Sequence, residues 1–345
     1  MGKKCKVCVI GAGIMGLSSA VRIQETIPDV DITIIADTFT PNTCSDGSGG
    51  FWELFLLPKD SMEQARKWCE ETWDLLYRLT VSQDAGSYGV HFVSGYNFTD
   101  IHIPHDPIWK DIVLGYRRLS VEERKLHPQN KDGVFYTTIM INVKKYLPQL
   151  MAKFRLNNGK VINRKVKSLE EVAKDYDIVV NCTGTGAYDL GDPSMKPIRG
   201  QVIRVQAPWV KHFYFDYDPT EKGNKLYIFP GKDYVVLGGT SQAGDWSTEV
   251  KEADTKRILD GCSRLIPSLK KAKILEQWVG LRPSRPTIRL EKQDLTVDGR
   301  KVTIVHNYGH SGSGVTIHWG CAKDTAELVE KCYRDNYDST MQSKL

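Results

Sequence analysis

Three glycines near the start of the chain have the spacing that binds the pyrophosphate of a dinucleotide. Gly11, Gly13 and Gly16 form G-x-G-x-x-G directly after the apolar residues of 6–10. The first glycine permits a tight turn, the second lets the backbone approach a phosphate, and the third lets the helix pack closely on the strand. The helix that follows would present its positive end to the phosphates. The spacing therefore predicts a dinucleotide site at a strand–helix turn.

An acidic residue stands at the distance that such a site requires. Residues 31–36 predict a second parallel strand, and Asp37 follows it. A carboxylate at this place accepts a hydrogen bond from a ribose hydroxyl. A plain glycine turn in an α/β domain is the alternative, but the strand, the spacing and the acid all favour the dinucleotide site.

Two further glycine-rich turns follow predicted strands. Residues 176–182 predict a strand that ends at Thr183-Gly184, and residues 302–306 predict another before the run from Ser311 to Thr316. Glycines bring backbone N–H groups close to a flat ring, and the helix predicted over 317–332 adds a positive end where such a ring gains negative charge. For both turns, a simple connection between elements is the alternative.

An arginine between prolines is the best candidate for binding a carboxylate. Arg282 lies in Gly280-Leu-Arg-Pro-Ser-Arg-Pro286, where the prolines restrict the backbone. A planar guanidinium suits bidentate binding of a carboxylate. Tyr227 could donate its hydroxyl to the same carboxylate. The alternatives are a surface ion pair for Arg282 and a core position for Tyr227. Arg285 is either a partner of Arg282 in binding the carboxylate or a surface charge.

The order of these elements predicts an α/β fold with two domains. A Rossmann-like cofactor domain would be discontinuous, with an inserted, mostly antiparallel α+β substrate domain, because strands 201–206 and 234–237 suggest a second sheet. Helices are predicted over 62–79, 142–156 and 169–173, although Pro148 argues against the second. The predicted boundaries are 1–50, 155–197 and 287–340 for the cofactor domain, 51–154 and 198–286 for the substrate domain, and 341–345 for a tail.

Composition excludes several classes of partner. The chain has 345 residues with a net charge of only +5, and its basic residues form no long tract, so we expect no nucleic-acid partner. Apolar runs are shorter than about 18 residues, which predicts no membrane-spanning helix. The eight cysteines lack zinc-ligand spacing, so we expect no metal site. Ser343-Lys344-Leu345 matches a peroxisomal address, which predicts recognition by the import receptor and a location in the peroxisomal matrix.

These residues together resemble one family over nearly the whole chain, namely the FAD-dependent D-amino-acid oxidases and D-aspartate oxidases. The resemblance rests on the motifs Val9–Ser18, Phe39–Pro41, Val179–Gly184, Arg199–Gln201, Ala207–Trp209 with His212-Phe213, Leu237–Gly239, Gly244–Trp246, Gly280–Pro283, Tyr308–His310 and Ile317–Gly320. The resemblance implies oxidative deamination of D-amino acids to 2-oxo acids and ammonia, with hydride transfer to flavin N5 and reduction of molecular oxygen to hydrogen peroxide. It leaves a homodimer open.

The resemblance also implies which residues bind the cofactor and the substrate. Arg282 and Tyr227 would be the catalytic residues that hold the substrate carboxylate, with Glu53 and Ser313 beside the substrate. FAD would contact Gly11, Ala12, Gly13, Ile14, Met15, Gly16, Asp37, Thr38, Thr43, Cys44, Ser45, Gly49, Gly50, Val166, Thr183, Gly184, Arg282, Ser311, Gly312, Ser313, Gly314, Val315 and Thr316.

One loop departs from the family pattern. The family usually has Asp-Val-Ala-Ala-Gly where this chain has Asp46-Gly-Ser-Gly-Gly50. Because glycine loosens a backbone, we expect a more flexible loop, which leaves the affinity for FAD open. Glu53 also replaces the glutamine of the neutral-substrate oxidases, so it either favours cationic side chains or faces solvent.

Two positions bear on the preferred substrate. D-aspartate oxidases read a second carboxylate with basic residues, but this chain has Ser241 at one expected position and no arginine in the lid segment 213–226. We therefore expect neutral or basic D-amino acids. The alternative is a D-aspartate oxidase that acts on D-aspartate and D-glutamate, with Lys222 or Lys225 in place of the arginine.

Overall fold

The computed structural model describes residues 5–28, 30–99, 102–103, 105–126, 130–217 and 225–342. The helices are α1 (Ile14–Thr26), α2 (Met62–Thr80), α3 (Ala85–Tyr88), α4 (Val121–Leu126), α5 (Val143–Leu156), α6 (Leu169–Ala173), α7 (Glu252–Leu265) and α8 (Gly314–Gln342). The strands are β1 (Lys6–Ile10), β2 (Asp31–Ala36), β3 (Val90–Thr99), β4 (Leu114–Arg118), β5 (Asp132–Ile141), β6 (Lys160–Asn163), β7 (Ile178–Asn181), β8 (Lys196–Gln206), β9 (Phe213–Tyr217), β10 (Lys225–Pro230), β11 (Val235–Gly238), β12 (Gln242–Ala243), β13 (Lys273–Val297) and β14 (Arg300–His310).

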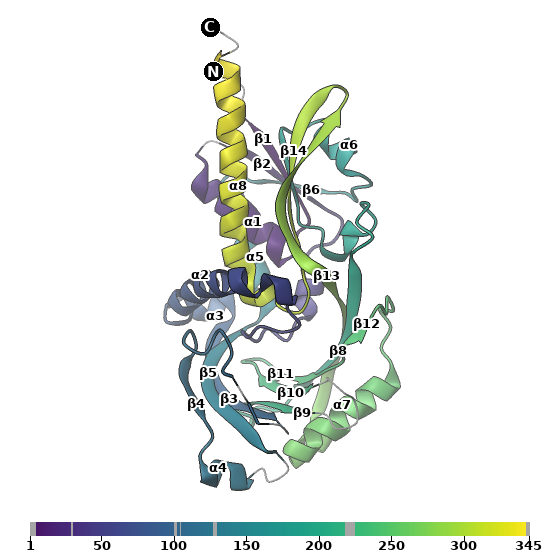
Figure 1. Ribbon diagram of the computed structural model, residues 1–345. Helices are drawn as coiled ribbons and strands as arrows, with labels where there is room; N and C mark the ends of the chain where they lie inside the picture. The colour runs from purple at the N-terminus through teal and green to yellow at the C-terminus, as the bar shows by residue number, and fades with distance from the viewer. Residues whose placement is uncertain are drawn as a thin grey trace.

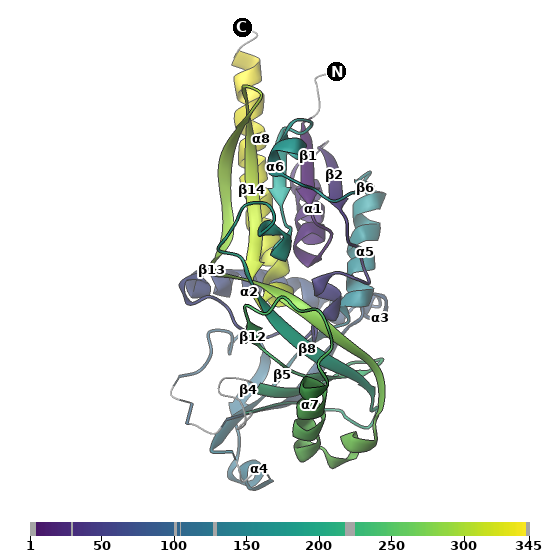
Figure 2. The ribbon, with the colours of Figure 1, turned by 90° about the vertical axis from the view of Figure 1, so that its right-hand side faces the viewer.

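A parallel sheet in the order β14-β7-β1-β2-β6 carries the glycine fingerprint. Its central strands are apolar throughout because both faces are covered. Val7 and Val9 pack in the same cluster as residues of α1 and α8, whereas Cys8 and Ile10 pack with α6 and β14. Figures 1 and 2 show α1 and α8 side by side along this part of the molecule. The sheet holds the loops after β1 and β2 at one edge.

The second region consists mostly of antiparallel strands that continue the same sheet. Along the described residues the path runs β4-β5-β3-β9-β10-β11-β8-β13-β14, and only β3 and β9 pair in parallel there. Strand β13 is 25 residues long and pairs with β8 along its first part and with β14 along its second. The fold class predicted from the sequence is confirmed, and in Figure 1 β13 connects the two regions.

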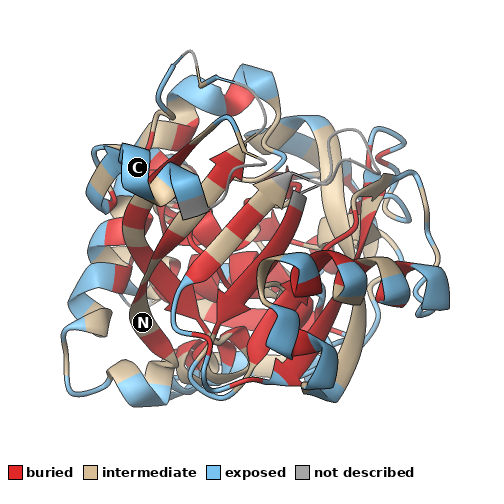
Figure 3. Ribbon diagram, turned by 90° about the horizontal axis from the view of Figure 1, so that it is seen from below, coloured by how far each residue is buried: buried red, intermediate tan, exposed pale blue. Residues whose placement is uncertain are grey.

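One helix and two strands cross the predicted domain boundaries. The boundaries at 154/155, 197/198 and 286/287 fall inside α5, β8 and β13. Both regions therefore share these elements, and the division into domains stays a prediction. The helix predicted over 142–156 forms as α5 with Pro148 inside it. Figure 3 shows buried residues concentrated in the strands of the shared sheet.

Some predictions fall on residues that the structure does not describe. Ser343–Leu345 and Lys222 are not among the described residues, and the side chain of Lys225 is not described, so the import signal and the lysine alternative stay predictions. Within the described part of the chain, no helix combines the length and apolar character that crossing a membrane requires. The same residues contain no group of three or more histidine, cysteine or acidic side chains placed to hold a metal.

Candidate cofactor and substrate site

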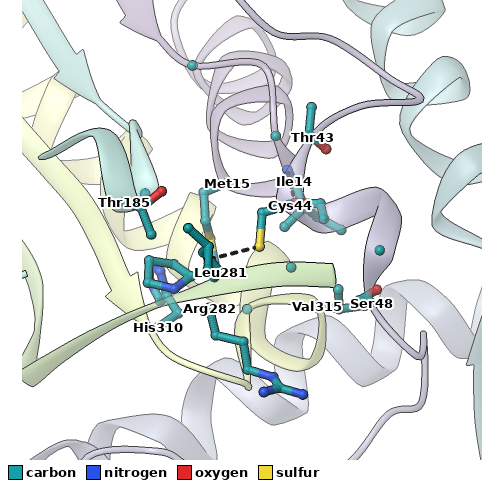
Figure 4. A pocket seen from close by; sticks show the side chains of 18 of the residues that line it. Ile14, Met15, Thr43, Cys44, Ser48, Thr185, Leu281, Arg282, His310 and Val315 are labelled. Atoms are coloured by element: carbon teal, nitrogen blue, oxygen red, sulfur yellow. Dashed lines mark hydrogen bonds between the residues drawn. The ribbon is translucent and has the colours of Figure 1, made fainter. Parts of the chain in front are cut away.

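A cavity of about 570 Å³ extends from the ends of the parallel strands to the antiparallel region. This volume lies within the range of small-molecule and cofactor sites. Its lining includes the ends of β1 and β2, the first turn of α1, the loop before α8, and parts of β10 and β13. Figure 4 shows Ile14, Met15, Cys44 and Leu281 gathered at this cavity, with Arg282 extending from β13 away from Cys44.

Most of the predicted site residues line this one cavity. The lining includes Gly11, Ala12, Gly13, Ile14, Met15, Asp37, Thr38, Thr43, Cys44, Ser45, Gly49, Gly50, Glu53, Val166, Thr183, Gly184, Tyr227, Arg282, Ser311, Gly312, Gly314, Val315 and Thr316. The structure therefore brings together segments that lie far apart in the sequence. Gly16 and Ser313, by contrast, are not among the lining residues.

The fingerprint glycines are required by close backbone contacts. Gly11 has a φ of +105°, and a Cβ atom there would lie 2.6 Å from the carbonyl oxygen of Cys182. A Cβ atom on Gly16 would lie 1.9 Å from the carbonyl oxygen of Gly11. Gly16 therefore allows α1 to pack on the preceding turn, and the predicted contact between Gly16 and the cofactor is not supported. The N–H of Ile14, in the first turn of α1, donates to Ser45 Oγ at 3.1 Å.

The glycines of the loop at 46–50 are packed against the protein, which contradicts the expected flexibility. A Cβ atom on Gly47 would lie 1.7 Å from Nε1 of Trp278, and one on Gly50, whose φ is +68°, would lie 2.0 Å from the carbonyl oxygen of Ile141. The guanidinium of Arg204 donates to the carbonyl oxygen of Asp46 at 2.7 Å. Close neighbours therefore require small residues here, and they hold the loop in place.

The guanidinium of Arg282 is positioned by three neighbours. Its Nη1 donates to the carbonyl oxygen of Thr240 at 3.0 Å. A Cβ atom on Gly200 would lie 2.4 Å from both Nη atoms, so the glycine makes room for the guanidinium. The guanidinium carbon lies 5.5 Å from the centre of the Phe55 ring. A cation with a fixed orientation thus lines the cavity, as binding of a carboxylate would require.

Tyr227 belongs to an aromatic wall of the same cavity. Its ring stacks on Phe229, with centres 4.4 Å apart, and Phe229 stacks on Phe51 at 4.3 Å. Phe215 packs edge-on against both Tyr227 and Phe229. Burial raises the pKa of Tyr227, although the Arg282 guanidinium acts in the opposite direction. The phenol is therefore protonated at neutral pH and can donate a hydrogen bond beside Arg282.

Glu53 lines the cavity and is held from behind by a tyrosine. Its carboxylate accepts a hydrogen bond from the hydroxyl of Tyr136, a fully buried residue of β5. Burial, and then the Glu53 charge, raises the pKa of Tyr136 well above its usual value. The backbone carbonyl of Glu53 also accepts from Thr316 Oγ1 at 2.7 Å. Glu53 is therefore part of the cavity wall, and its side chain is engaged by the protein.

Ser313 does not take the substrate-binding position that we predicted. Its side chain is completely buried, and its hydroxyl accepts from the N–H of Phe55 and donates to the carbonyl oxygen of Phe55, both at 2.9 Å. The hydroxyl is thus engaged by the backbone of one residue. We correct the assignments of Ser313 to the substrate and to the cofactor accordingly.

Several residues that line the cavity could not be predicted from the sequence. Phe51, Phe55, Phe215 and Phe229 form much of its apolar surface, and Trp278 lies behind the loop at 46–50. Phe215 and Phe229 are buried residues of β9 and β10, and buried aromatic residues are typical of any core strand. No local signal distinguishes such residues from the rest of the core.

The chain is similar to known proteins over nearly its whole length. The family model described as DAO, FAD dependent oxidoreductase, matches residues 6–328. The chain is 40% identical to the D-aspartate oxidase of Homo sapiens over 95% of both chains. It is 39% identical to the D-amino acid oxidase of Dugesia ryukyuensis, over 94% of this chain and 97% of the relative. The solved glycine oxidase of Geobacillus kaustophilus shares the fold, with a TM-score of 0.73 and 17% identity over 95% of both chains.

The protein is thus a flavin-dependent oxidoreductase by family. The chain belongs to the FAD-dependent oxidoreductase family that its sequence matches from residue 6 to residue 328. Its curated relatives include both D-aspartate oxidases and D-amino-acid oxidases.

The residues present fit FAD. The cavity combines a glycine turn at a helix N-terminus, which suits a pyrophosphate, with the carboxylate of Asp37, which suits a ribose. Buried polar atoms of Ser48, Asn307, His310 and Ser311 have no hydrogen-bond partner among the described residues, and all four residues line the cavity. Buried polar groups are normally hydrogen-bonded, so their clustering here is consistent with a polar ligand.

Proposed function

We propose that this protein oxidises neutral or basic D-amino acids to 2-oxo acids, ammonia and hydrogen peroxide. One observation carries the proposal: Arg282 and the phenol of Tyr227 line the same cavity as the dinucleotide fingerprint. A carboxylate binder beside a flavin site is what oxidation of an α-amino acid requires. When bound, FAD supplies the acceptor for the hydride of the substrate Cα and passes the electrons to oxygen.

The protein contributes binding and orientation. Arg282 pairs with the α-carboxylate, and Tyr227 donates its phenolic proton in a hydrogen bond to the same group. Two fixed donors allow few orientations of the substrate, so the position of its Cα hydrogen is set by which enantiomer is bound. The aromatic rings of Phe51, Phe215 and Phe229 exclude water and accommodate an apolar side chain.

The charges along the cavity favour a neutral or basic side chain. Among the described residues that line it, the cations are Arg164, Lys165 and Arg282. Arg164 follows β6 and its N–H donates to the carbonyl oxygen of Ala36, so it lies at the Asp37 end. At the aromatic end, Arg282 is thus the cation among these lining residues, while Glu53 adds a negative charge. A second carboxylate on the substrate would meet the charge of Glu53 and, among these lining residues, no further cation.

Oxidation of D-aspartate and D-glutamate is the second candidate. The identity of 40% with the human D-aspartate oxidase favours it. The two candidates differ in the charge of the preferred side chain, which a substrate panel resolves directly.

The test measures peroxide production by purified protein supplied with FAD. The panel contains D-methionine, D-alanine, D-arginine, D-aspartate and D-glutamate, with the L-enantiomers as controls. We expect turnover of D-methionine, D-alanine or D-arginine with no turnover of L-forms. Turnover confined to D-aspartate and D-glutamate would establish the second candidate. Absence of peroxide with every D-amino acid would contradict both.

A further inference from the structure

We propose that Ser313 and Phe55 are positioning residues for the guanidinium of Arg282. This inference rests on the proposed function, in which Arg282 binds the substrate carboxylate. Ser313 lies in the loop before α8, and Arg282 lies on β13. Phe55 lies four residues after Phe51, a residue of the aromatic wall. Phe55 thus contacts both of the other segments, Ser313 through its backbone and Arg282 through its ring.

The first contact fixes the backbone of Phe55. The Ser313 hydroxyl accepts from the Phe55 N–H and donates to the Phe55 carbonyl oxygen, each at 2.9 Å. One hydroxyl therefore satisfies both polar groups of this residue. Ser313 is itself held, because its N–H donates to the carbonyl oxygen of His310 at 3.0 Å and its side chain is fully buried.

The second contact fixes the ring of Phe55. A Cβ atom on Gly312 would lie 2.6 Å from Cδ1 of Phe55 and 2.8 Å from its carbonyl oxygen. Phe55 thus packs directly on the glycine next to Ser313. No larger residue fits at 312 unless Phe55 moves, so the loop before α8 determines where the ring lies.

The third contact transmits this position to the cation. The guanidinium carbon of Arg282 lies 5.5 Å from the centre of the Phe55 ring, within the range of a cation–π interaction. The guanidinium is also held by the hydrogen bond from Nη1 to the carbonyl oxygen of Thr240. With one nitrogen bound and the cation resting on an aromatic ring, the guanidinium is oriented before a carboxylate arrives. Such preorganisation lowers the cost of binding.

The test compares four variants as FAD-loaded proteins. Phe55→Leu removes the ring but keeps an apolar side chain, Phe55→Tyr keeps the ring, and Ser313→Ala removes both hydrogen bonds. Phe135→Leu is the matched control, because Phe135 lies 4.7 Å from the guanidinium of Arg117 but does not line the cavity. The readouts are the Kd for butanoate, an unreactive carboxylate, from the flavin absorption spectrum, the Kd for FAD, and kcat and KM for D-methionine.

We expect Phe55→Leu to raise the Kd for butanoate and the KM for D-methionine about 3- to 30-fold, which corresponds to loss of one cation–π contact. Ser313→Ala should act in the same direction, while Phe55→Tyr and Phe135→Leu should resemble the wild type. The affinity for FAD should stay within about twofold in every variant. A purely structural role would instead weaken FAD binding and stability without a selective effect on the carboxylate.

The inference is overturned if Phe55→Leu and Ser313→Ala both leave the Kd for butanoate within twofold of the wild type. If Phe55→Leu does not fold, the Kd of Ser313→Ala for butanoate alone decides whether the inference stands. Failure of the proposed function looks different. The wild type would then oxidise neither D-methionine nor any other neutral or basic D-amino acid, and butanoate binding that still depends on Phe55 would support the positioning role on its own.

Discussion

Gly47 offers the sharpest test of how the loop at 46–50 is held. A Cβ atom there would lie 1.7, 2.2 and 2.5 Å from three indole atoms of Trp278, far inside van der Waals contact. The indole cannot move easily, because Lys144 and Arg204 lie 5.3 and 5.9 Å from its ring centre and both pair with Glu276. Gly47→Ala should therefore overpack this contact.

Overpacking of this kind lowers the free energy of unfolding by about 1–3 kcal/mol. Alanine also reduces the conformational entropy of the unfolded chain relative to glycine, which offsets about 0.4–1 kcal/mol of this loss. We expect the free energy of unfolding to fall by about 1–2 kcal/mol. Because Gly47 lines the cavity, displacement of the loop should weaken FAD binding about tenfold. Urea unfolding of the protein without FAD and fluorescence titration with FAD measure the two effects.

Trp278→Phe in the same chain should restore much of both losses, because the smaller ring vacates the space that the new methyl group needs. Gly86→Ala is the control, since Gly86 is exposed in α3. Outside its own helix and chain neighbours, a Cβ atom there would have only Lys232 Nζ within 4 Å among the described residues, at 3.8 Å. Unchanged stability and FAD affinity in Gly47→Ala would refute the reasoning. The reasoning would also be refuted if the double variant with Trp278→Phe were no more stable than Gly47→Ala and bound FAD no more tightly.

Three further predictions concern single side chains at the cavity. Arg282→Ala should abolish turnover of D-amino acids while FAD stays bound, which peroxide assays and the flavin spectrum check together; full activity would contradict the role of the guanidinium. Ser311 has a φ of +51°, a backbone conformation that favours glycine. Ser311→Gly should therefore leave the free energy of unfolding unchanged or raise it by up to about 1 kcal/mol, and the melting temperature should not fall. A clear loss of stability would show that the hydroxyl contributes more than the relief of strain. Burial lowers the pKa of His310 from 6.5 to about 3, so the unfolded chain takes up a proton first as the pH falls. The stability that this residue contributes is complete above pH 6.5 and is lost as the pH falls toward 3. Between pH 7 and pH 5 the loss amounts to about 2 kcal/mol. Urea unfolding at both pH values should show this extra loss in the wild type but not in His310→Phe.

The parts of the site that the sequence predicts are those specified by neighbouring residues. A Cβ atom on Gly16 would meet Gly11 within one strand–turn–helix unit, so the spacing of the fingerprint indicates this contact. The strands β1 and β2 are recognisable because they are apolar on both faces. Asp37 lies at the cavity for the same local reason.

The parts that the sequence does not predict depend on partners far away in the chain. The hydroxyl of Ser313 meets the backbone of Phe55, 258 residues earlier, and nothing near either residue indicates the contact. The loop at 46–50 looks flexible by composition but is packed against Trp278. Strand β13 continues through Pro283 and Pro286, residues that normally argue against a strand, because it pairs with β8 and β14 on either side of an irregularity between Ser284 and Arg289.

The central claim is that this cavity transfers the Cα hydrogen of a D-amino acid to bound FAD. Mixing the FAD-loaded protein with D-methionine or L-methionine in the absence of oxygen tests it most directly. The account predicts rapid bleaching of the visible flavin absorption by the D-enantiomer, none by the L-enantiomer, and none by either in Arg282→Ala. Equal bleaching by both enantiomers, or unchanged bleaching in that variant, would contradict it.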